Sequence, residues 1–232
     1  MNRLREFPYV MMNMAMSADG KISTRLREPI TLGTVHDRLL MDRLRAQADA
    51  VIIGAGTLRV DGFPLLVRNS DVRRRRTSRG MDPHPVNILL SRSLAIPTHR
   101  LFFENPTTRK IIYTSRSAGL KKRKQLERYA EIVLVPVRSS FLKYVLSDLT
   151  GRGFKKVLVE GGGELNFSFF REGLVDEIYL TITPRIIGGG GAPTVVDGRG
   201  FLKHNHIKLG LRSVKRVGNE LFLRYRVGPT AG

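Results

Sequence analysis

The chain contains no cysteine and no tryptophan among its 232 residues. Without cysteine it can form no disulfide, no thiolate nucleophile and no zinc site that needs sulfur, and we expect no metal centre. Two clusters of basic residues, Arg73–Arg76 and Lys121–Lys124, have no interleaved aromatic residues. A stacking platform for single-stranded nucleic acid is therefore not evident. No apolar run approaches the roughly 18 residues of a membrane-spanning helix.

The apolar stretch Tyr9–Met16 superficially resembles a signal peptide. Asn13 interrupts it, Glu6 precedes it and Asp19 follows closely, so a strand explains the stretch better. We therefore expect a cytoplasmic protein that is not attached to a membrane.

Acidic residues are few: 20 Asp plus Glu stand against 40 Lys plus Arg, which gives a formal net charge of +20. Such a surface attracts anions, including phosphorylated metabolites, dinucleotides and nucleic acid. Arg73–Arg76 lies within Asn69–Pro85, whose Ser, Gly, Asp and Pro content predicts a loop inserted near 69–85. We expect this loop to steer anionic ligands and to be dispensable for chemistry. Lys121–Lys124 is expected to be a solvated helix face.

Strand-like and helical patterns alternate along the chain, which favours an α/β fold with a largely parallel sheet in a single domain over residues 1–232. Gly218-Asn219 predicts a hairpin turn and thus antiparallel strands at one edge. A capping box, Thr34-x-x-Asp37, starts the first helix. The expected strands are 9–16, 50–53, 86–90, 110–113, 132–135, 157–159, 177–182, 207–217 and 221–227, and the expected helices are 36–47, 120–130, 141–150 and 165–172.

The most informative segment is Lys156–Asn166. A buried strand, Val157–Val159, is followed by Glu160, three glycines and a helical pattern. Glycines let a backbone approach a ligand closely, and a helix start presents unpaired N–H groups that suit a phosphate. The alternative is a tight turn with a solvated glutamate. The segment is neither a Rossmann fingerprint nor a P-loop.

Three further segments place polar residues or glycines after a strand: Met16–Ile22, Ile52–Asp61 and Asp176–Gly191. Each one alone also has a structural explanation as a turn, a helix cap or a sharp loop. Together, and in this order with Lys156–Asn166, they resemble the reductase domain of riboflavin biosynthesis, which has a dihydrofolate-reductase-like fold. The similarity spans roughly residues 8 to 226. The zinc deaminase that precedes this domain in bifunctional relatives needs cysteines that this chain lacks.

The resemblance implies which residues contact a nicotinamide cofactor, expected to be NADPH. Arg92 is placed to suit the 2′-phosphate of NADPH, and Asp61 is placed near a ribose of the cofactor. The full implied set is Thr24, Thr57, Asp61, Ser91, Arg92, Gly161, Gly162, Gly163, Glu164 and Leu165.

On the substrate side, the resemblance implies that Arg45, Leu65 and Arg68 surround a phosphorylated ribosylaminopyrimidine. Glu160 would accept hydrogen bonds from the amino and ring N–H groups of the pyrimidine. Lys21 matches a lysine at the reacting sugar, where it would polarise or protonate the sugar oxygen as a general acid. The alternative is that Lys21 only binds phosphate.

The leading hypothesis is an NADPH-dependent reductase of the riboflavin pathway that acts on a diaminopyrimidinone or an aminouracil. Two alternatives stay open: a reductase of another pteridine- or pyrimidine-like compound, and an RNA-binding protein with a vestigial site. Nothing in the sequence matches an RNA-binding motif, so nucleic acid is not expected as a partner. The resemblance also implies a homodimer.

Relatives differ from this chain at Arg25–Pro29, where they often carry a short Gly/Ser stretch.

Overall fold

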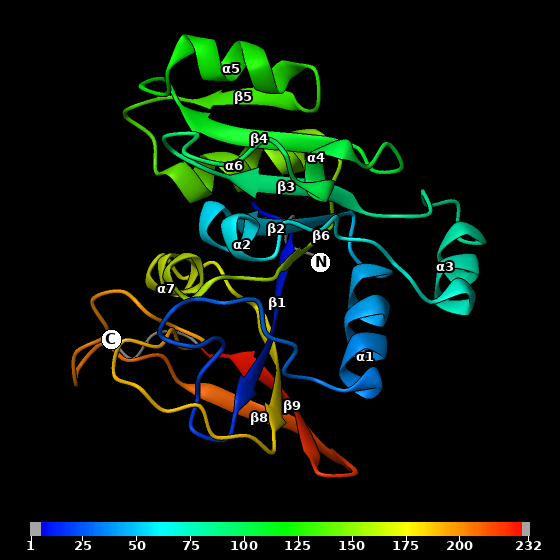
Figure 1. The fold of residues 1–232 in the computed structure, drawn as a ribbon, viewed down its shortest axis with the longest axis vertical. Coiled ribbons are helices and arrows are strands. Elements are labelled where there is room, and N and C mark those ends of the chain that lie inside the picture. The colour runs from blue at the N-terminus through cyan, green and yellow to red at the C-terminus, as the bar shows by residue number, and fades with distance from the viewer. Residues whose placement is uncertain (1–5, 229–232) are drawn as a thin grey trace. The chain divides into compact units, whose positions relative to one another are not determined.

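A computed structural model describes residues 6–228, within which nine strands and seven helices are formed (Figure 1). The strands are β1 (Tyr9–Ser17), β2 (Ala50–Gly54), β3 (Val86–Leu90), β4 (Lys110–Ser115), β5 (Glu131–Val135), β6 (Lys156–Val159), β7 (Glu177–Thr183), β8 (Leu209–Val217) and β9 (Glu220–Val227). The helices are α1 (Val35–Arg45), α2 (Ala55–Val60), α3 (Ser70–Thr77), α4 (Leu101–Glu104), α5 (Leu120–Glu127), α6 (Phe141–Gly151) and α7 (Gly163–Arg171).

The strands form one sheet in the order β5-β4-β3-β2-β6-β1-β7-β9-β8. The pairs β2/β3, β3/β4, β4/β5 and β1/β7 are parallel, whereas β7/β9 and β8/β9 are antiparallel. The predicted α/β fold with a mostly parallel sheet and an antiparallel C-terminal hairpin is therefore confirmed.

The chain divides into two compact units, each built from separate stretches of sequence. Of the described residues, the first unit contains 6–9 and 42–158, and the second contains 10–41 and 159–228. The single domain that the sequence predicts over residues 1–232 stays a prediction.

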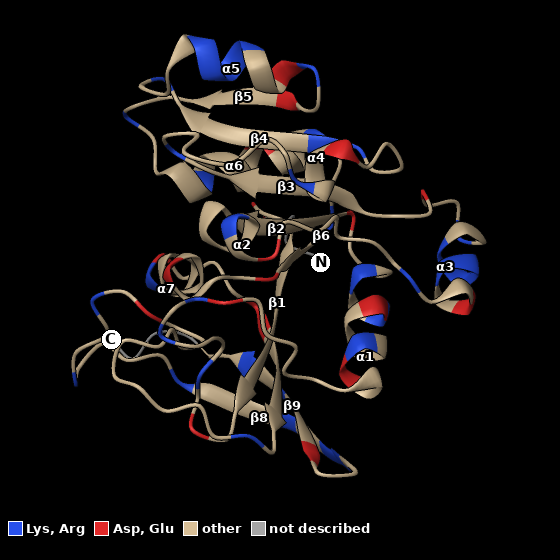
Figure 2. Ribbon diagram, in the orientation of Figure 1, with Lys and Arg blue, Asp and Glu red and all other residues tan. Residues whose placement is uncertain are grey.

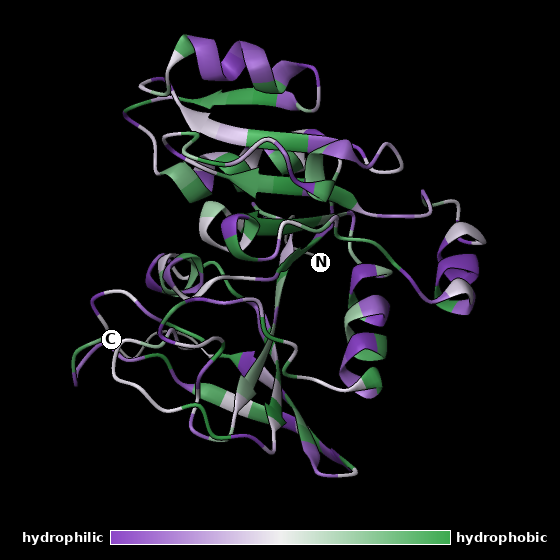
Figure 3. Cartoon of the chain, in the orientation of Figure 1, coloured by the Kyte–Doolittle hydropathy of each residue, from purple (hydrophilic) through white to green (hydrophobic). Residues whose placement is uncertain are grey.

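The core of the first unit is built on β2 and β3. All five residues of β3 and four of the five in β2 are buried, as expected for parallel strands covered on both faces. Figure 3 shows β2 and β3 largely in the green of hydrophobic residues. Helix α6 contributes an apolar stripe of five buried residues. The stripe comprises Phe141, Leu142, Val145, Leu146 and Leu149.

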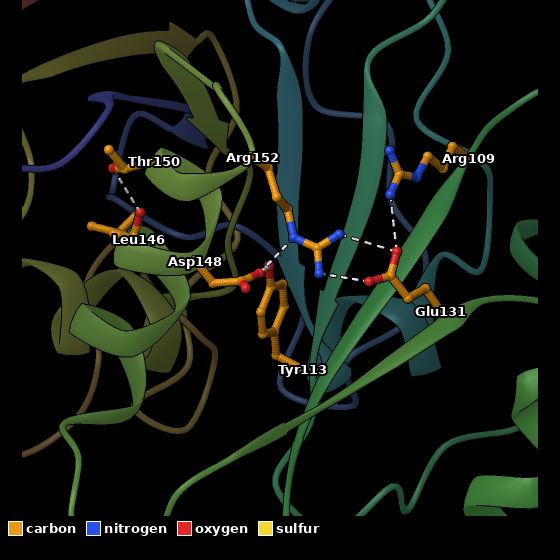
Figure 4. Close-up of polar contacts among 7 residues, drawn as sticks. All are labelled: Arg109, Tyr113, Glu131, Leu146, Asp148, Thr150 and Arg152. Atoms are coloured by element: carbon orange, nitrogen blue, oxygen red, sulfur yellow. Dashed lines mark hydrogen bonds and ion pairs between the residues drawn. The ribbon is translucent and has the colours of Figure 1, made fainter.

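A polar network ties α6 to β4 and β5 within this unit (Figure 4). Glu131 accepts hydrogen bonds from Arg152 and, at 2.9 Å, from Arg109. Asp148 accepts from the Arg152 Nε and the Tyr113 hydroxyl, both at 2.6 Å. The bond from Arg152 holds the pKa of Glu131 below its usual range, and burial raises the pKa of Tyr113. The network therefore favours the ionised form of Glu131 and the protonated form of Tyr113.

In the second unit, the hairpin of β8 and β9 turns at Gly218-Asn219, as predicted. Val217 and Glu220 are paired across the turn, and Gly218 has a φ of 58°. A two-residue hairpin turn needs a positive φ at its first central position, which glycine adopts without steric cost.

The segment around Arg73–Arg76 differs from the loop that the sequence predicts, because residues 70–77 form α3. The Asn69 side chain caps this helix by accepting hydrogen bonds from the N–H groups of Asp71 and Val72. Asp71 also pairs with Arg74 on the surface. Lys and Arg residues lie along α3 and α5 in Figure 2.

Arg76 is buried and is not available to a ligand. Its guanidinium donates to the carbonyls of Arg45, Ala46 and Ala48 at the end of α1, and its Nε donates to the carbonyl of Asp82. A cation suits the negative end of a helix dipole. Burial lowers the pKa of Arg76, and the charges of Asp49 and Asp82 oppose that shift.

No helix in the described range 6–228 is long and apolar enough to cross a membrane.

We predict that Arg76→Met destabilises the protein by roughly 3 kcal/mol, because the carbonyls at the end of α1 lose their buried, charged donor. Arg75→Met is the matched control, since Arg75 is exposed on the same helix. Urea unfolding followed by circular dichroism measures both. Equal midpoints for the two variants would show that Arg76 does not hold the end of α1.

Candidate functional site

The predicted site residues fall in both units. In the second unit, β1 and β7 are parallel and end side by side, with Ser17 paired to Thr183. The chain beyond β1 carries Asp19, whose carboxylate accepts hydrogen bonds from the Ser17 hydroxyl at 2.6 Å and from the N–H groups of Ile187 and Gly188. These bonds lower the pKa of Asp19 to about 2. Asp19 therefore connects the turn after β1 to the glycine-rich loop after β7.

Lys21 is held by the same turn. Its N–H donates to the Ser17 hydroxyl at 2.9 Å, it forms a bridge with Thr194, and its Nζ donates to the Ala192 carbonyl at 3.3 Å. The backbone of Lys21 is therefore held by Ser17 and Thr194, and its ammonium group is held by the Ala192 carbonyl. Thr24 lies further along and donates to Glu28 Oε2 at 2.8 Å, so Glu28, in the divergent segment, supports this loop.

The turn after β6 has the form that the sequence predicts. Glu160 is half-buried at the end of the strand, and Gly161 has a φ of 87°, a conformation that favours glycine. Helix α7 begins at Gly163, and its N-cap Gly162 offers no side chain to the free N–H groups. The first turn of α7 therefore keeps N–H groups without a side-chain cap.

Gly163 is required for packing inside the protein as well. A Cβ added there would lie 2.5 Å from the Thr194 carbonyl oxygen and 2.4 Å from Asp197 Oδ2. The Asp197 N–H also donates to the Gly163 carbonyl at 3.1 Å. Glu164 is exposed and Leu165 is half-buried in the first turn. The third glycine thus allows residues 194–197 to pack against the start of α7.

Asp37 is a residue that sequence reasoning interpreted only as part of a capping box. The reciprocal bond of that box is absent, because the Thr34 N–H donates to Glu220 Oε1 at 2.8 Å instead. Glu220 also accepts from the Thr34 hydroxyl at 2.6 Å. The Asp37 carboxylate therefore does not cap the Thr34 N–H at the start of α1. Glycine at position 33 makes room for it, since a Cβ there would lie 2.2 Å from Asp37 Oδ2.

The Asp37 carboxyl occupies a polar, partly desolvated place. Burial raises its pKa, as do the charges of Glu220 and Glu160, while the Thr181 hydroxyl and Arg38 oppose the shift. Asp37 Oδ1 and Thr181 Oγ1 are buried without completing a hydrogen bond of good geometry. A carboxyl with a raised pKa near Glu160 is a candidate functional group. The signal that could have found it, Glu220, is far away in the sequence.

In the first unit, β2 and β3 end together, with Gly54 paired to Leu90. Residues beyond both ends therefore share one edge of the sheet. Thr57 lies in α2, and the exposed Asp61 is its C-cap. Buried Ser91 accepts a hydrogen bond from the Leu94 N–H at 3.1 Å. All four cofactor residues that the sequence predicts in this unit follow these two strand ends in the chain: Thr57, Asp61, Ser91 and Arg92.

Arg92 is exposed, and its guanidinium carbon lies 4.4 Å from the ring centroid of Phe141 at the start of α6. Its carbonyl accepts from the hydroxyls of Thr114 and Ser115 on β4. This contact holds the cation over one face of the ring.

The three substrate residues predicted in this unit lie on or against one irregular segment, residues 65–69. The Leu65 N–H donates to Asn87 Oδ1 at 2.8 Å, and the Leu65 carbonyl accepts from Asn87 Nδ2 at 3.2 Å. Arg45 is buried, not solvated as helix arginines usually are, and donates to the Leu66 carbonyl at 2.9 Å. Arg68 is exposed. Arg45 therefore supports the segment that carries Arg68.

Comparison with known proteins identifies close relatives. The chain is 34% identical over 212 residues to the 2,5-diamino-6-ribosylamino-4(3H)-pyrimidinone 5′-phosphate reductase of Archaeoglobus fulgidus, covering 91% of this chain and 94% of that protein. It is 32% identical over 222 residues to the reductase of the same name from Methanothermobacter thermautotrophicus, covering 95% and 98%. It is 29% identical to the riboflavin biosynthesis protein RibD of Actinobacillus pleuropneumoniae, of which it spans 57%.

Solved structures share the fold. A pyrimidine reductase-like protein from Corynebacterium diphtheriae superposes with a TM-score of 0.81 at 24% identity, covering 95% of this chain and 92% of that one. Acinetobacter baumannii RibD gives 0.78 at 22% identity, covering 96% and 59%. The dihydrofolate-reductase-like fold that the sequence predicts is confirmed by this likeness.

The match extends over nearly the whole chain. Residues 8–223 correspond to the RibD C-terminal domain, the same stretch in which the four strand-end segments were found. The chain belongs to the RibD C-terminal domain family.

Proposed function

We propose that this protein reduces the ribosylamino group of a phosphorylated pyrimidine to a ribitylamino group, with NADPH as the reductant, in riboflavin biosynthesis. The observation that carries the proposal is the similarity to the archaeal pyrimidinone phosphate reductases, which extends over more than 90% of both chains. The arrangement of polar residues after the strands supports it, because ligands of α/β sheets bind at the carboxyl ends of strands.

The chain offers groups that fit a dinucleotide phosphate. The start of α7 has no side-chain cap, so its N–H groups suit a pyrophosphate. Arg92, oriented by Phe141, suits a 2′-phosphate, because a planar guanidinium binds phosphate through two donors. When bound, NADPH supplies the hydride for C1′ of the sugar.

Glu160 and Lys21 would act on the substrate. Glu160 is an anionic acceptor of two hydrogen bonds, which suits the amino and ring N–H groups of a pyrimidine. The Lys21 ammonium, held at the Ala192 carbonyl, is a proton donor for the sugar oxygen as the ring opens. Lys21 would then lower the barrier, whereas a lysine that only binds phosphate would change affinity.

A homodimer, which the family resemblance implies, is also part of the proposal. Strand β8 stands at the end of the strand order, and eight of its nine residues are exposed. Leu209, Leu211 and Val214 are 43%, 54% and 55% exposed. An edge strand with exposed apolar side chains supports pairing with a second copy.

We predict that the protein binds NADPH more tightly than NADH. Arg92→Ala should narrow that preference about tenfold or more, the worth of one charge-assisted hydrogen bond. Calorimetric titration of both nucleotides into the wild type, Arg92→Ala and Arg92→Lys measures the effect, with Arg75→Ala as the surface control. Equal affinity of the wild type for both nucleotides would refute the role given to Arg92.

We predict that Glu160→Gln lowers kcat/KM at least about tenfold, since a neutral amide loses the charged acceptor, while the melting temperature changes little. Glu127→Gln, an exposed carboxylate on α5, is the control. A Glu160→Gln enzyme that unfolds easily but keeps full specific activity would overturn the assignment of Glu160 to substrate binding.

In the same assay, Lys21→Ala should lower kcat if lysine acts in the transition state and mainly raise KM if it binds phosphate.

A further inference from the structure

The segment that carries Arg68 is held by side chains and not by a strand. At its centre, the Val67 N–H donates to His84 Nδ1 at 3.1 Å, and the Val67 carbonyl accepts from the Arg73 guanidinium at 3.2 Å. The two following N–H groups, of Arg68 and Asn69, donate to the two oxygens of Asp42 at 3.0 and 2.8 Å. Val67 is fully buried. These bonds fix the backbone on both sides of Arg68.

His84 differs from the other partners because its acceptor can be lost. Nδ1 accepts a hydrogen bond only in the neutral ring, whose proton is then on Nε2. A protonated His84 carries N–H on both nitrogens. It would present a donor to the Val67 N–H, so the bond would be replaced by repulsion.

The surroundings of His84 favour its neutral form. Burial lowers its pKa from the ordinary 6.5, and the charges of Arg73 and Arg76 on α3 lower it further. Asp42 on α1 opposes the shift. Two arginines of the basic run thus act on the imidazole, and one of them also bonds to the Val67 carbonyl.

We propose that His84 is a positioning residue for substrate binding: its neutral Nδ1 holds Val67, and through the shared backbone it holds Arg68 where a phosphorylated substrate is bound. The role of Arg68 rests on the proposed function. The hold of His84 on Val67 rests on geometry alone. Because the pKa of His84 is lowered, the bond is present at neutral pH. It is lost as pH falls through the pKa of His84. Substrate affinity falls with it.

Two variants separate the acceptor from its titration. His84→Asn places a carbonyl oxygen near the position of Nδ1 and cannot be protonated in this range, whereas His84→Leu removes the acceptor at every pH. His99→Asn is the control, because His99 is exposed elsewhere in the same unit.

The experiment has two readouts between about pH 8 and pH 5. In ¹⁵N-labelled protein, the Val67 amide resonance should titrate together with the His84 ring, with a midpoint below 6.5, and should not do so in His84→Asn. In steady-state assays, KM for the phosphorylated pyrimidine should rise about two- to tenfold on acidification, the worth of one hydrogen bond. The KM for NADPH and kcat should change less. His84→Asn should lose this acid-side rise, and His84→Leu should show the raised KM at pH 8.

The outcomes are distinct. A Val67 amide that ignores the titration of His84 overturns the proposal, whether or not the enzyme turns over. A Val67 amide that titrates while KM stays flat in an active enzyme overturns the link from His84 to Arg68. If no pyrimidine is reduced at all, the proposed function fails, and this proposal fails with it unless the Kd of the phosphorylated pyrimidine shows the same pH dependence and the same loss of it in His84→Asn.

Discussion

Buried backbone N–H and carbonyl groups in the loops beyond the sheet need hydrogen-bond partners, because an unpaired buried polar group costs as much free energy as a lost hydrogen bond. In this protein, charged and amide side chains supply many of those partners. Asp42 binds two successive N–H groups after Val67, Asp19 binds two in the glycine-rich loop, and Glu220 binds Thr34. The loops that carry the candidate site therefore have defined conformations without being strands or helices.

The same constraint changes the meaning of the basic composition. The net charge of +20 suggests an anion-binding surface, but several arginines are engaged inside the protein. Arg76 binds carbonyls at the end of α1, Arg45 binds Leu66, and Arg152 joins two carboxylates. Each donates to groups of its own chain. A count of charges thus overstates how many cations are available to an external anion.

Sequence patterns predicted the elements that depend on nearby residues. Apolar runs located the strands, and Gly218-Asn219 located the hairpin. The sequence predicts a loop in place of helix α3 because of the Ser, Gly, Asp and Pro content of Asn69–Pro85, although Asn69 and Asp71 provide an N-cap and an acidic first turn. The environment of Asp37 could not be predicted, because it depends on Glu220 and Thr181, which only the folded chain brings near. Elements set by neighbouring residues could therefore be predicted from the sequence, whereas contacts between residues far apart in the sequence could not.

The central claim is that this chain transfers hydride from NADPH to the sugar carbon of a phosphorylated ribosylaminopyrimidine. The most direct measurement incubates the purified protein with NADPH and either the diaminopyrimidinone or the aminouracil, and identifies the product by mass spectrometry. Our account predicts a product two mass units heavier than one of these substrates, formed in step with NADPH oxidation. Turnover of neither pyrimidine, with NADPH bound and the protein folded, would contradict it.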